Sequence, residues 1–208
     1  MLHTQTVEPH TFSLLKELMQ MPSLNHFGLV GGTALSLLYG HRMSEDLDIF
    51  SSITFENATI INELKNKFEN RFVVEEKPPR LGIFCFIDNI KVDIIHHPHQ
   101  QIKPVINMDG IRMFSVEDII AMKIQAVLGR GKKKDFWDIA ELLQHYTITD
   151  FIKFHTEKYS TQNLLITVPQ AITYFSDAEE SEAPVSLKQQ NWESVQKIIS
   201  KKVSEYLK

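Results

Sequence analysis

The chain has 208 residues, of which 43% are hydrophobic and 23% charged, a composition that excludes wholesale disorder and is typical of a globular protein. Lys and Arg number 22 against 26 Asp and Glu, and the formal net charge of −4 excludes a global positive field for nucleic acid, so any such contact needs a local basic patch. With one cysteine, an intrachain disulfide framework and a multi-cysteine zinc site are also excluded.

The N-terminus lacks the basic segment followed by an apolar segment that marks a secretory signal. No stretch of the sequence approaches the roughly 18 consecutive apolar residues of a membrane span. We therefore expect a soluble cytoplasmic protein that has no membrane partner.

Leucine and methionine recur over residues 8–21 at the spacing of one helix face, which predicts a helix that ends at Pro22. The apolar run 27–30 predicts a short buried strand. Gly31-Gly32 follows this strand, and residues 33–39 predict a helix that begins at once. The expected order is strand, glycine turn and helix.

Charged and apolar residues alternate over 46–50, which predicts a strand, and the helical pattern of residues 55–70 follows it. Two further strand-like runs, 81–87 and 90–95, are separated by Asp88-Asn89. This pair suits a two-residue hairpin turn, so we expect the two strands to pair antiparallel.

The pattern becomes helical at Ser115, an N-cap residue that precedes an acidic first turn. A second helix is predicted over 133–145, and the remainder is mostly helical apart from the polar stretch 177–183. The expected fold class is α+β: a mixed sheet with flanking helices over 1–114, followed by a helical C-terminal region over 115–208.

Two carboxylates stand at i and i+2 of the predicted strand 46–50. In an extended backbone Asp46 and Asp48 point to one face with Cα atoms roughly 6.5 Å apart, so both can reach one pair of cations. Oxygen ligands select Mg²⁺ or Mn²⁺, and two such ions can clamp the attacking and leaving oxygens of a nucleotidyl transfer. Asp93 is the candidate third ligand, because its strand is expected to lie beside that of Asp48.

The glycine pair offers what a triphosphate needs. Gly31 and Gly32 leave the backbone unobstructed by Cβ, the helix N-terminus favours an anion, and Thr33 adds a hydroxyl. A Walker P-loop lysine and the spaced glycines of a dinucleotide fingerprint are both missing. A glycine pair by itself is more often a plain turn, as Asp46-x-Asp48 by itself is often a solvated strand end.

In combination, the glycine pair and the carboxylates resemble the nucleotidyltransferase fold of the DNA polymerase beta superfamily. Longer motifs resemble the AbiEii/AbiGii toxin family of nucleotidyltransferases, which is associated with abortive phage infection and toxin–antitoxin pairs. These motifs are Arg42-x-Ser44-x-Asp46-x-Asp48-Ile49-Phe50, Ala121-Met122-Lys123 and Arg130-Gly131-Lys132-Lys133-Lys134-Asp135-Phe136-Trp137-Asp138-Ile139.

The resemblance implies a nucleotidyltransferase core over 1–114, with an active-site cleft completed by the helical region 115–208. It implies Asp46 and Asp48 as catalytic metal ligands and Asp93 as the third acid, whose position varies among such enzymes. In residues 147–208 we match no motif to the family. The nucleotide-binding residues that follow are Gly31, Gly32, Thr33, Arg42, Ser44, Lys123 and Asp135.

Some of these residues have structural alternatives. Lys123 alone is consistent with a solvated helix lysine, and Asp135 with the acid of a first helical turn. Arg42 can clamp a phosphate or pair with Glu45 or Asp46.

Two further clusters, one of basic residues and one of histidines, give less specific evidence for nucleotidyl transfer. Lys132, Lys133 and Lys134, with Arg130, can hold the nucleotide or an RNA backbone, or can form a solvated loop between helices. His96, His97 and His99 lack a zinc-type partner set, so no metal site is expected there.

The leading hypothesis is a metal-dependent nucleotidyltransferase that moves a nucleoside monophosphate from an NTP to an acceptor hydroxyl, releasing pyrophosphate. The resemblance implies RNA, a transfer RNA end, as the acceptor and a separate antitoxin as the protein partner. The alternatives are a small-molecule acceptor, as in antibiotic-modifying members of the superfamily, and a non-catalytic nucleotide-binding or protein-binding module on the same fold.

Overall fold

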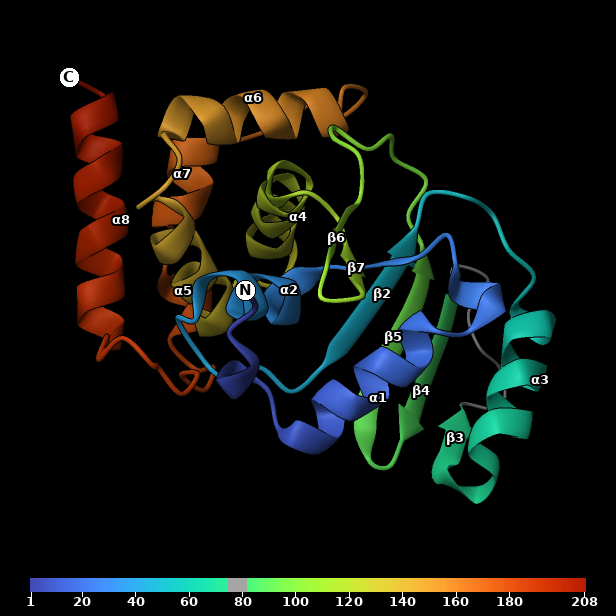
Figure 1. The fold of residues 1–208 in the computed structure, drawn as a ribbon. Coiled ribbons are helices and arrows are strands. Elements are labelled where there is room, and N and C mark those ends of the chain that lie inside the picture. The colour runs from blue at the N-terminus through green and yellow to red at the C-terminus, as the bar shows by residue number, and fades with distance from the viewer. Residues whose placement is uncertain (75–81) are drawn as a thin grey trace.

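The computed structural model describes residues 1–74 and 82–208 and has the expected α+β class (Figure 1). Within these residues a mixed seven-stranded sheet has the order β3-β4-β5-β2-β1-β7-β6. The strands are β1 (Gly28–Leu29), β2 (Leu47–Ser51), β3 (Phe72–Val74), β4 (Gly82–Ile87), β5 (Ile90–His96), β6 (Ile106–Met108) and β7 (Ile111–Met113).

The sheet contains both parallel and antiparallel strand pairs. The central strand β2 pairs parallel with β5 on one side and antiparallel with β1 on the other, and β1 pairs parallel with β7. The pairs β3–β4, β4–β5 and β6–β7 are antiparallel. The predicted turn at Asp88-Asn89 joins β4 to β5 and has φ values of 52° and 64°, so this hairpin is confirmed; Leu81 of the predicted run lies outside the described residues.

Helices cover the sheet and continue beyond it. Figure 1 shows α3 beside β3, whereas the C-terminal helices α4 to α8 gather at the opposite end of the molecule. None of the helices within the described residues is both long and apolar enough to cross a bilayer. The helices are α1 (Pro9–Met19), α2 (Gly31–Tyr39), α3 (Asn57–Phe68), α4 (Val116–Gly129), α5 (Lys133–Leu142), α6 (Ile148–Lys158), α7 (Val168–Thr173) and α8 (Trp192–Tyr206), and short 3-10 turns cover Thr4–Thr6, Pro22–Leu24, Glu69–Arg71 and Ser176–Ala178.

Burial along β2 separates a core face from a site face. Leu47 and Ile49 are buried in the core, whereas Asp48 and Phe50 between and beyond them are only half-buried. This period of two is what an extended strand imposes. The face that carries Asp48 and Phe50 therefore points away from the core, toward the C-terminal helices.

The predicted start of α4 is confirmed, whereas α2 starts earlier than predicted. Ser115 caps α4 as expected, because its Oγ accepts the backbone N–H of Asp118 at 3.1 Å. The helix after β1 begins at Gly31 rather than at Thr33, so the glycines form its first turn and no separate loop precedes it. The strands β6 and β7 were not predicted, although Asp109-Gly110 between them, with φ values of 54° and 82°, is a hairpin turn signal.

A late segment of the chain pairs with an early one. Residues 185–187 run antiparallel to residues 41–43: Arg42 bridges Ser186, Met43 N–H donates to the Val185 carbonyl, and Leu187 N–H donates to the His41 carbonyl, both at 2.9 Å. The segment that leads into β2 is therefore flanked by residues from near the start of α8.

Candidate active site

The carboxylates of two adjacent parallel strands face each other in register. Asp48 of β2 pairs directly with Asp93 of β5. The expectation that the strand of Asp93 lies beside that of Asp48 is therefore confirmed. Asp46 lies just before β2, two residues from Asp48.

Asp48 lies against the start of α2. A Cβ placed on Gly31 would be 2.6 Å from Asp48 Oδ2, and the φ of Gly31 is +71°, a conformation that favours glycine. Burial raises the pKa of the Asp48 carboxyl, and the neighbouring Asp93 carboxylate raises it further. Two acids at this site therefore repel each other in the absence of a cation.

Asp93 is only partly satisfied. Its Oδ2 accepts from the Lys91 ammonium, whereas its Oδ1 is buried and has no hydrogen-bond partner. An orphaned carboxylate oxygen is costly, so this atom is one at which a ligand or cation would be stabilised.

Asp46 and the hydroxyls of the motif hold the segment that enters β2. Lys134 Nζ of α5 is 3.1 Å from Asp46 Oδ2. Thr33 Oγ1 donates to the Asp46 carbonyl oxygen and lies 2.9 Å from Ser44 Oγ. Both hydroxyls are buried, so Thr33 and Ser44 fix the loop from within rather than projecting into solvent.

The residues present fit a divalent cation on Asp48 and Asp93. A cation would offset the repulsion between these carboxylates and give Asp93 Oδ1 the partner it lacks. Within residues 1–74 and 82–208, no three His, Cys, Asp or Glu side chains are grouped closely enough to hold a metal ion as they stand. The predicted set with Asp46 is therefore not preassembled, because Asp46 is paired with Lys134.

Lys123 of α4 is a buried cation opposite the carboxylates. Its Nζ lies 3.0 Å from Asp135 Oδ1 and 2.6 Å from Asp138 Oδ2 of α5, and the residue is 4% exposed. Burial acts to lower the pKa of Lys123, but the two aspartates outweigh it and the pKa is raised. The solvated-lysine alternative is therefore wrong, and Lys123 is held as a charged group.

Arg42 pairs with Asp138 and not, as one alternative had it, with Glu45 or Asp46. Its Nε and Nη2 donate to the two carboxylate oxygens of Asp138 at 2.7 and 2.9 Å, and the guanidinium is buried beneath Gly32. A Cβ on Gly32 would be 2.0 Å from Arg42 Nη2. The guanidinium thus supports the glycine pair from below.

Asp138 is the site residue that the sequence analysis did not single out. It accepts from Arg42 and Lys123, and His41 Nε2 lies 2.8 Å from its Oδ1. Asp135, one turn earlier, accepts from Arg130 at 3.0 Å as well as from Lys123. The i, i+3 spacing of the two aspartates on a helix was the available signal.

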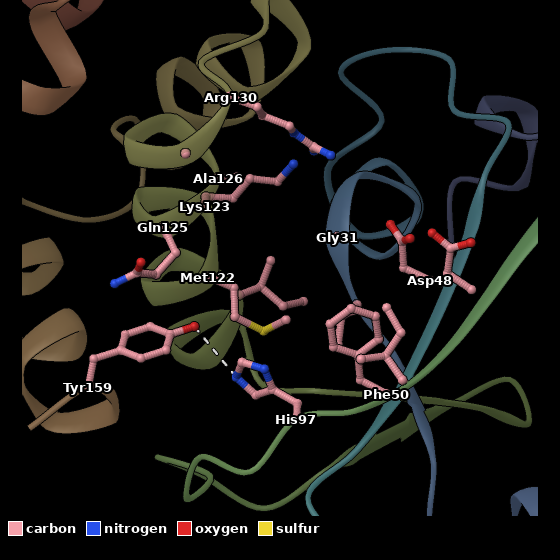
Figure 2. Close-up of a pocket in the computed structure, with 15 residues that line it drawn as sticks. Gly31, Asp48, Phe50, His97, Met122, Lys123, Gln125, Ala126, Arg130 and Tyr159 are labelled. Atoms are coloured by element: carbon pink, nitrogen blue, oxygen red, sulfur yellow. Dashed lines mark hydrogen bonds between the residues drawn. The ribbon is translucent and has the colours of Figure 1, made fainter. Parts of the chain in front are cut away.

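A cavity of about 420 Å³ lies between the sheet and α4 (Figure 2). In Figure 2, Lys123 and Arg130 extend toward Asp48, and Gly31 lies beside Asp48 where α2 begins. The predicted residues separate into a lining group and a supporting group, because this cavity is not lined by Gly32, Thr33, Arg42, Ser44, Asp46 or Asp135. The lining residues are Val30, Gly31, Asp48, Phe50, Asp93, Ile95, His97, Ile119, Met122, Lys123, Gln125, Ala126, Gly129, Arg130 and Tyr159.

The basic patch at the start of α5 is in contact with an acidic stretch. Lys133 Nζ donates to the Glu179 carbonyl oxygen, and Lys133 N–H donates to Ser181 Oγ, both at 2.8 Å. The predicted polar stretch around these residues carries Asp177, Glu179, Glu180 and Glu182. Asp177, Glu180 and Glu182 line a surface hollow together with Arg130, Lys132 and Lys134, so the patch is not a uniformly positive surface.

The resemblance described above implies nucleotide binding at Gly31, and replacing Gly31 by alanine is expected to weaken that binding strongly, because the new methyl group would displace the Asp48 carboxylate. The left-handed backbone should lower the free energy of unfolding by about 1–2 kcal/mol as well. Calorimetric nucleotide titration and urea denaturation measure the two effects. Gly110→Ala is the matched control, since Gly110 has a φ of +82° and nothing within 4 Å: it should lose similar stability and keep nucleotide binding. Equal nucleotide binding by both variants would contradict the expectation.

Comparison with known proteins matches most of the chain to one family. The family model described as nucleotidyl transferase AbiEii toxin, type IV TA system, matches residues 13–200. The uncharacterized protein aq_aa25 of Aquifex aeolicus (strain VF5) is 31% identical over 199 residues, which cover 93% of this chain and 94% of that protein.

Solved structures show the same fold at low sequence identity. JHP933 from Helicobacter pylori is 19% identical with a TM-score of 0.57, covering 99% of this chain and 93% of that chain. MenT4, a nucleotidyltransferase toxin from Mycobacterium tuberculosis H37Rv, is 12% identical with a TM-score of 0.57, covering 95% and 86%.

Proposed function

Because the chain belongs to the AbiEii family of nucleotidyl transferase toxins, we propose that it transfers a nucleoside monophosphate from an NTP to a hydroxyl of an RNA, a transfer RNA end, with Mg²⁺ or Mn²⁺ bound at the site. The observation that carries this proposal is the in-register pair Asp48 and Asp93 at a cavity that Lys123 closes from the opposite side. Carboxylates and a cation facing each other suit a metal-bound triphosphate.

The chain's own residues divide the work of binding. The triphosphate would lie near Gly31 at the start of α2, where the backbone is unobstructed and the helix N-terminus favours an anion. Lys123 would contact its oxygens as a fixed positive charge, since Asp135 and Asp138 already hold its ammonium in place. Arg42, Thr33 and Ser44 would act from behind by keeping the loop in one conformation.

Asp93 is suited to the acceptor hydroxyl. Its Oδ1 is buried at the cavity without a partner, and a carboxylate oxygen has lone pairs for more than one neighbour. Beside a cation it can therefore also accept the hydroxyl hydrogen and orient the oxygen toward the α-phosphorus. Lys91 holds the other carboxylate oxygen and so fixes the direction of Oδ1.

A divalent cation would be held by Asp48 and Asp93, with Asp46 joining once it leaves Lys134. When bound, it would neutralise charge that develops on the phosphoryl oxygens. The proposal rests here on the unsatisfied Asp93 oxygen and on the raised pKa of Asp48.

The family description also supports a partner. A type IV toxin–antitoxin system has a separate antitoxin, so we propose that a second protein counteracts this chain. For the acceptor, Arg130 lines both this cavity and the adjacent hollow, where Lys132 and Lys134 lie among Asp177, Glu180 and Glu182. Arg130 and these two lysines support a phosphate backbone as the acceptor over an uncharged small molecule, although the hollow is mixed in charge.

A transfer assay on total cellular RNA tests the proposal. Each of the four α-³²P-labelled NTPs is incubated with the protein, Mg²⁺ and RNA, and the label is followed on a denaturing gel. We expect label from at least one NTP in a discrete RNA band of transfer RNA size, and none when EDTA replaces Mg²⁺. Label that appears only in small molecules from an RNA-free extract would replace RNA by a small-molecule acceptor.

Lys123 and Lys133 should affect different substrates. Lys123→Ala is expected to lower kcat/KM for the nucleotide roughly 10²-fold, because it removes a buried charge at the cavity. Lys133→Ala should weaken acceptor binding severalfold and make that binding less salt-dependent, because the Lys133 ammonium makes only an exposed hydrogen bond and lies outside the cavity that Lys123 lines. Steady-state kinetics in each substrate at several salt concentrations separates these effects. A larger loss of free-nucleotide binding in Lys133→Ala than in Lys123→Ala would contradict the assignment.

A further inference from the structure

The cavity beside Asp48 has two chemically different ends. One end carries Asp48, Asp93, Lys123 and Arg130, the groups assigned above to the triphosphate, the cation and the acceptor. The other end is lined by an aromatic, aliphatic and thioether set: Phe50, Ile95, His97, Met122 and Tyr159. Figure 2 shows the two groups apart, with Tyr159, His97 and Phe50 on the side opposite Arg130.

The strands set the direction from one end to the other. Phe50 follows Asp48 by two residues on β2, so it lies on the same face roughly 7 Å further along. Ile95 follows Asp93 in the same way on β5, which runs parallel to β2. His97 continues the row, since its N–H donates to the Ser51 carbonyl at 2.8 Å and keeps the chain beside β2.

The helices close this end from the other side. Met122 of α4 directly precedes Lys123, and in Figure 2 its thioether reaches toward Phe50. Tyr159, at the end of α6, is 4% exposed, and its hydroxyl lies 3.5 Å from His97 Nε2. The Phe50 and His97 rings have centroids 5.9 Å apart, so a planar ring that entered here beside Phe50 and Met122 would also come within reach of the His97–Tyr159 pair.

This end carries no formal charge. Burial lowers the pKa of His97 to about 4, with a further contribution from the Lys158 ammonium, so the imidazole is neutral at neutral pH. A neutral imidazole and a phenol each have one donor and one acceptor, and when Tyr159 and His97 bond to each other the pair still offers one donor and one acceptor to a ligand. Such a lining disfavours a phosphate and suits an uncharged heteroaromatic ring with polar edge groups.

We infer that the aromatic end of the cavity binds the nucleobase of the NTP, stacked at Phe50 and Met122, and that His97 and Tyr159 determine which base is accepted. This inference rests on the proposed function, because the nucleotide's phosphates fix which end the base occupies. Stacking on an aromatic ring is tolerant of base identity, whereas hydrogen bonds to the base edge discriminate. Phe50 therefore contributes affinity, and the His97–Tyr159 pair contributes selectivity.

Calorimetric titration with two kinds of probe tests the inference. The four NTPs and inorganic tripolyphosphate are each titrated with Mg²⁺ into the wild type, Phe50→Ala, Tyr159→Phe and the control Tyr174→Phe, an exposed tyrosine. The wild type should bind its preferred NTP at least about tenfold more tightly than tripolyphosphate. Phe50→Ala should lose that advantage while tripolyphosphate affinity is kept, which also shows that the variant is folded.

Tyr159→Phe keeps the ring and removes only the hydroxyl, so this variant still tests the inference if Phe50→Ala does not fold. Its expected effect is a severalfold smaller ratio between the best-bound and worst-bound NTP, with tripolyphosphate unchanged and Tyr174→Phe equal to wild type. An unchanged selectivity ratio in Tyr159→Phe, or NTP binding in the wild type no tighter than tripolyphosphate, overturns the inference and leaves the proposed function standing. A wild type that binds no NTP and no tripolyphosphate overturns both.

Discussion

Asp48→Ala should abolish nucleotidyl transfer, with a loss of roughly 10³-fold or more, in a protein that remains folded. Asp48 faces Asp93 across the parallel pair β2–β5, so its removal takes away half of the carboxylate pair that fits a cation. The fold does not depend on this charge: the raised pKa of Asp48 means that its ionised form is disfavoured where it lies. Single-turnover transfer of labelled nucleotide at saturating and limiting Mg²⁺ measures the loss.

Thermal unfolding with and without Mg²⁺ supplies the control. Mg²⁺ should raise the Tm of the wild type and should have a much smaller effect on Asp48→Ala, since ligands stabilise the state that binds them. Glu45→Ala, an exposed acid close by in the sequence, should match the wild type in both measurements. Wild-type transfer by Asp48→Ala at limiting Mg²⁺ would show that the carboxylates are structural.

Asp138→Asn is expected to have the largest effect on stability, a loss of about 3–5 kcal/mol in the free energy of unfolding. Asp138 is fully buried and neutralises Arg42 and Lys123, which are 3% and 4% exposed. An amide keeps the shape but leaves these cations without their charge partner. Urea denaturation at neutral pH measures the loss, and Asp177→Asn on the surface should change stability by less than about 0.5 kcal/mol.

The same pair of proteins gives a pH dependence with a definite sign. Burial acts to raise the pKa of Asp138, but Arg42, Lys123 and His41 outweigh it and hold the pKa well below its ordinary range. A carboxyl whose folded-state pKa is lowered adds stability above its unfolded value, roughly 4, and that stability is lost as the pH falls toward the folded value. The stability difference between wild type and Asp138→Asn should therefore shrink below about pH 4. A difference that stayed constant from pH 7 to pH 3 would exclude this account.

The sequence predicted structure correctly where a feature depends on a few adjacent residues. The alternation around Asp48, the turn Asp88-Asn89 and the cap Ser115 each depend on a few adjacent residues, and each prediction agrees with the structure. The pairing of β2 with β5 followed from placing the carboxylates of Asp48 and Asp93 at one site, a chemical argument that used no contact information.

Contacts between residues far apart in the sequence could not be predicted in this way. Arg42 was weighed against the acids next to it in sequence, whereas its partner Asp138 lies 96 residues away. The short strands β3, β6 and β7 are three residues each, too brief for a period of two to be recognised. The contact between Lys133 and Glu179 likewise joins the start of α5 to the turn that follows Ser176–Ala178, 46 residues later in the chain.

The pairing of residues 185–187 with residues 41–43 has a consequence for synthesis on the ribosome. The N-terminal part of the chain is made first, but residues 41–43 can pair with residues 185–187 only after residue 187 has left the exit tunnel. Until then the backbone groups of Met43 and His41 lack the partners that they have in the finished protein. A growing chain therefore carries an unfinished site through most of its translation, and the complete arrangement forms only when nearly all of the sequence shown here has been made.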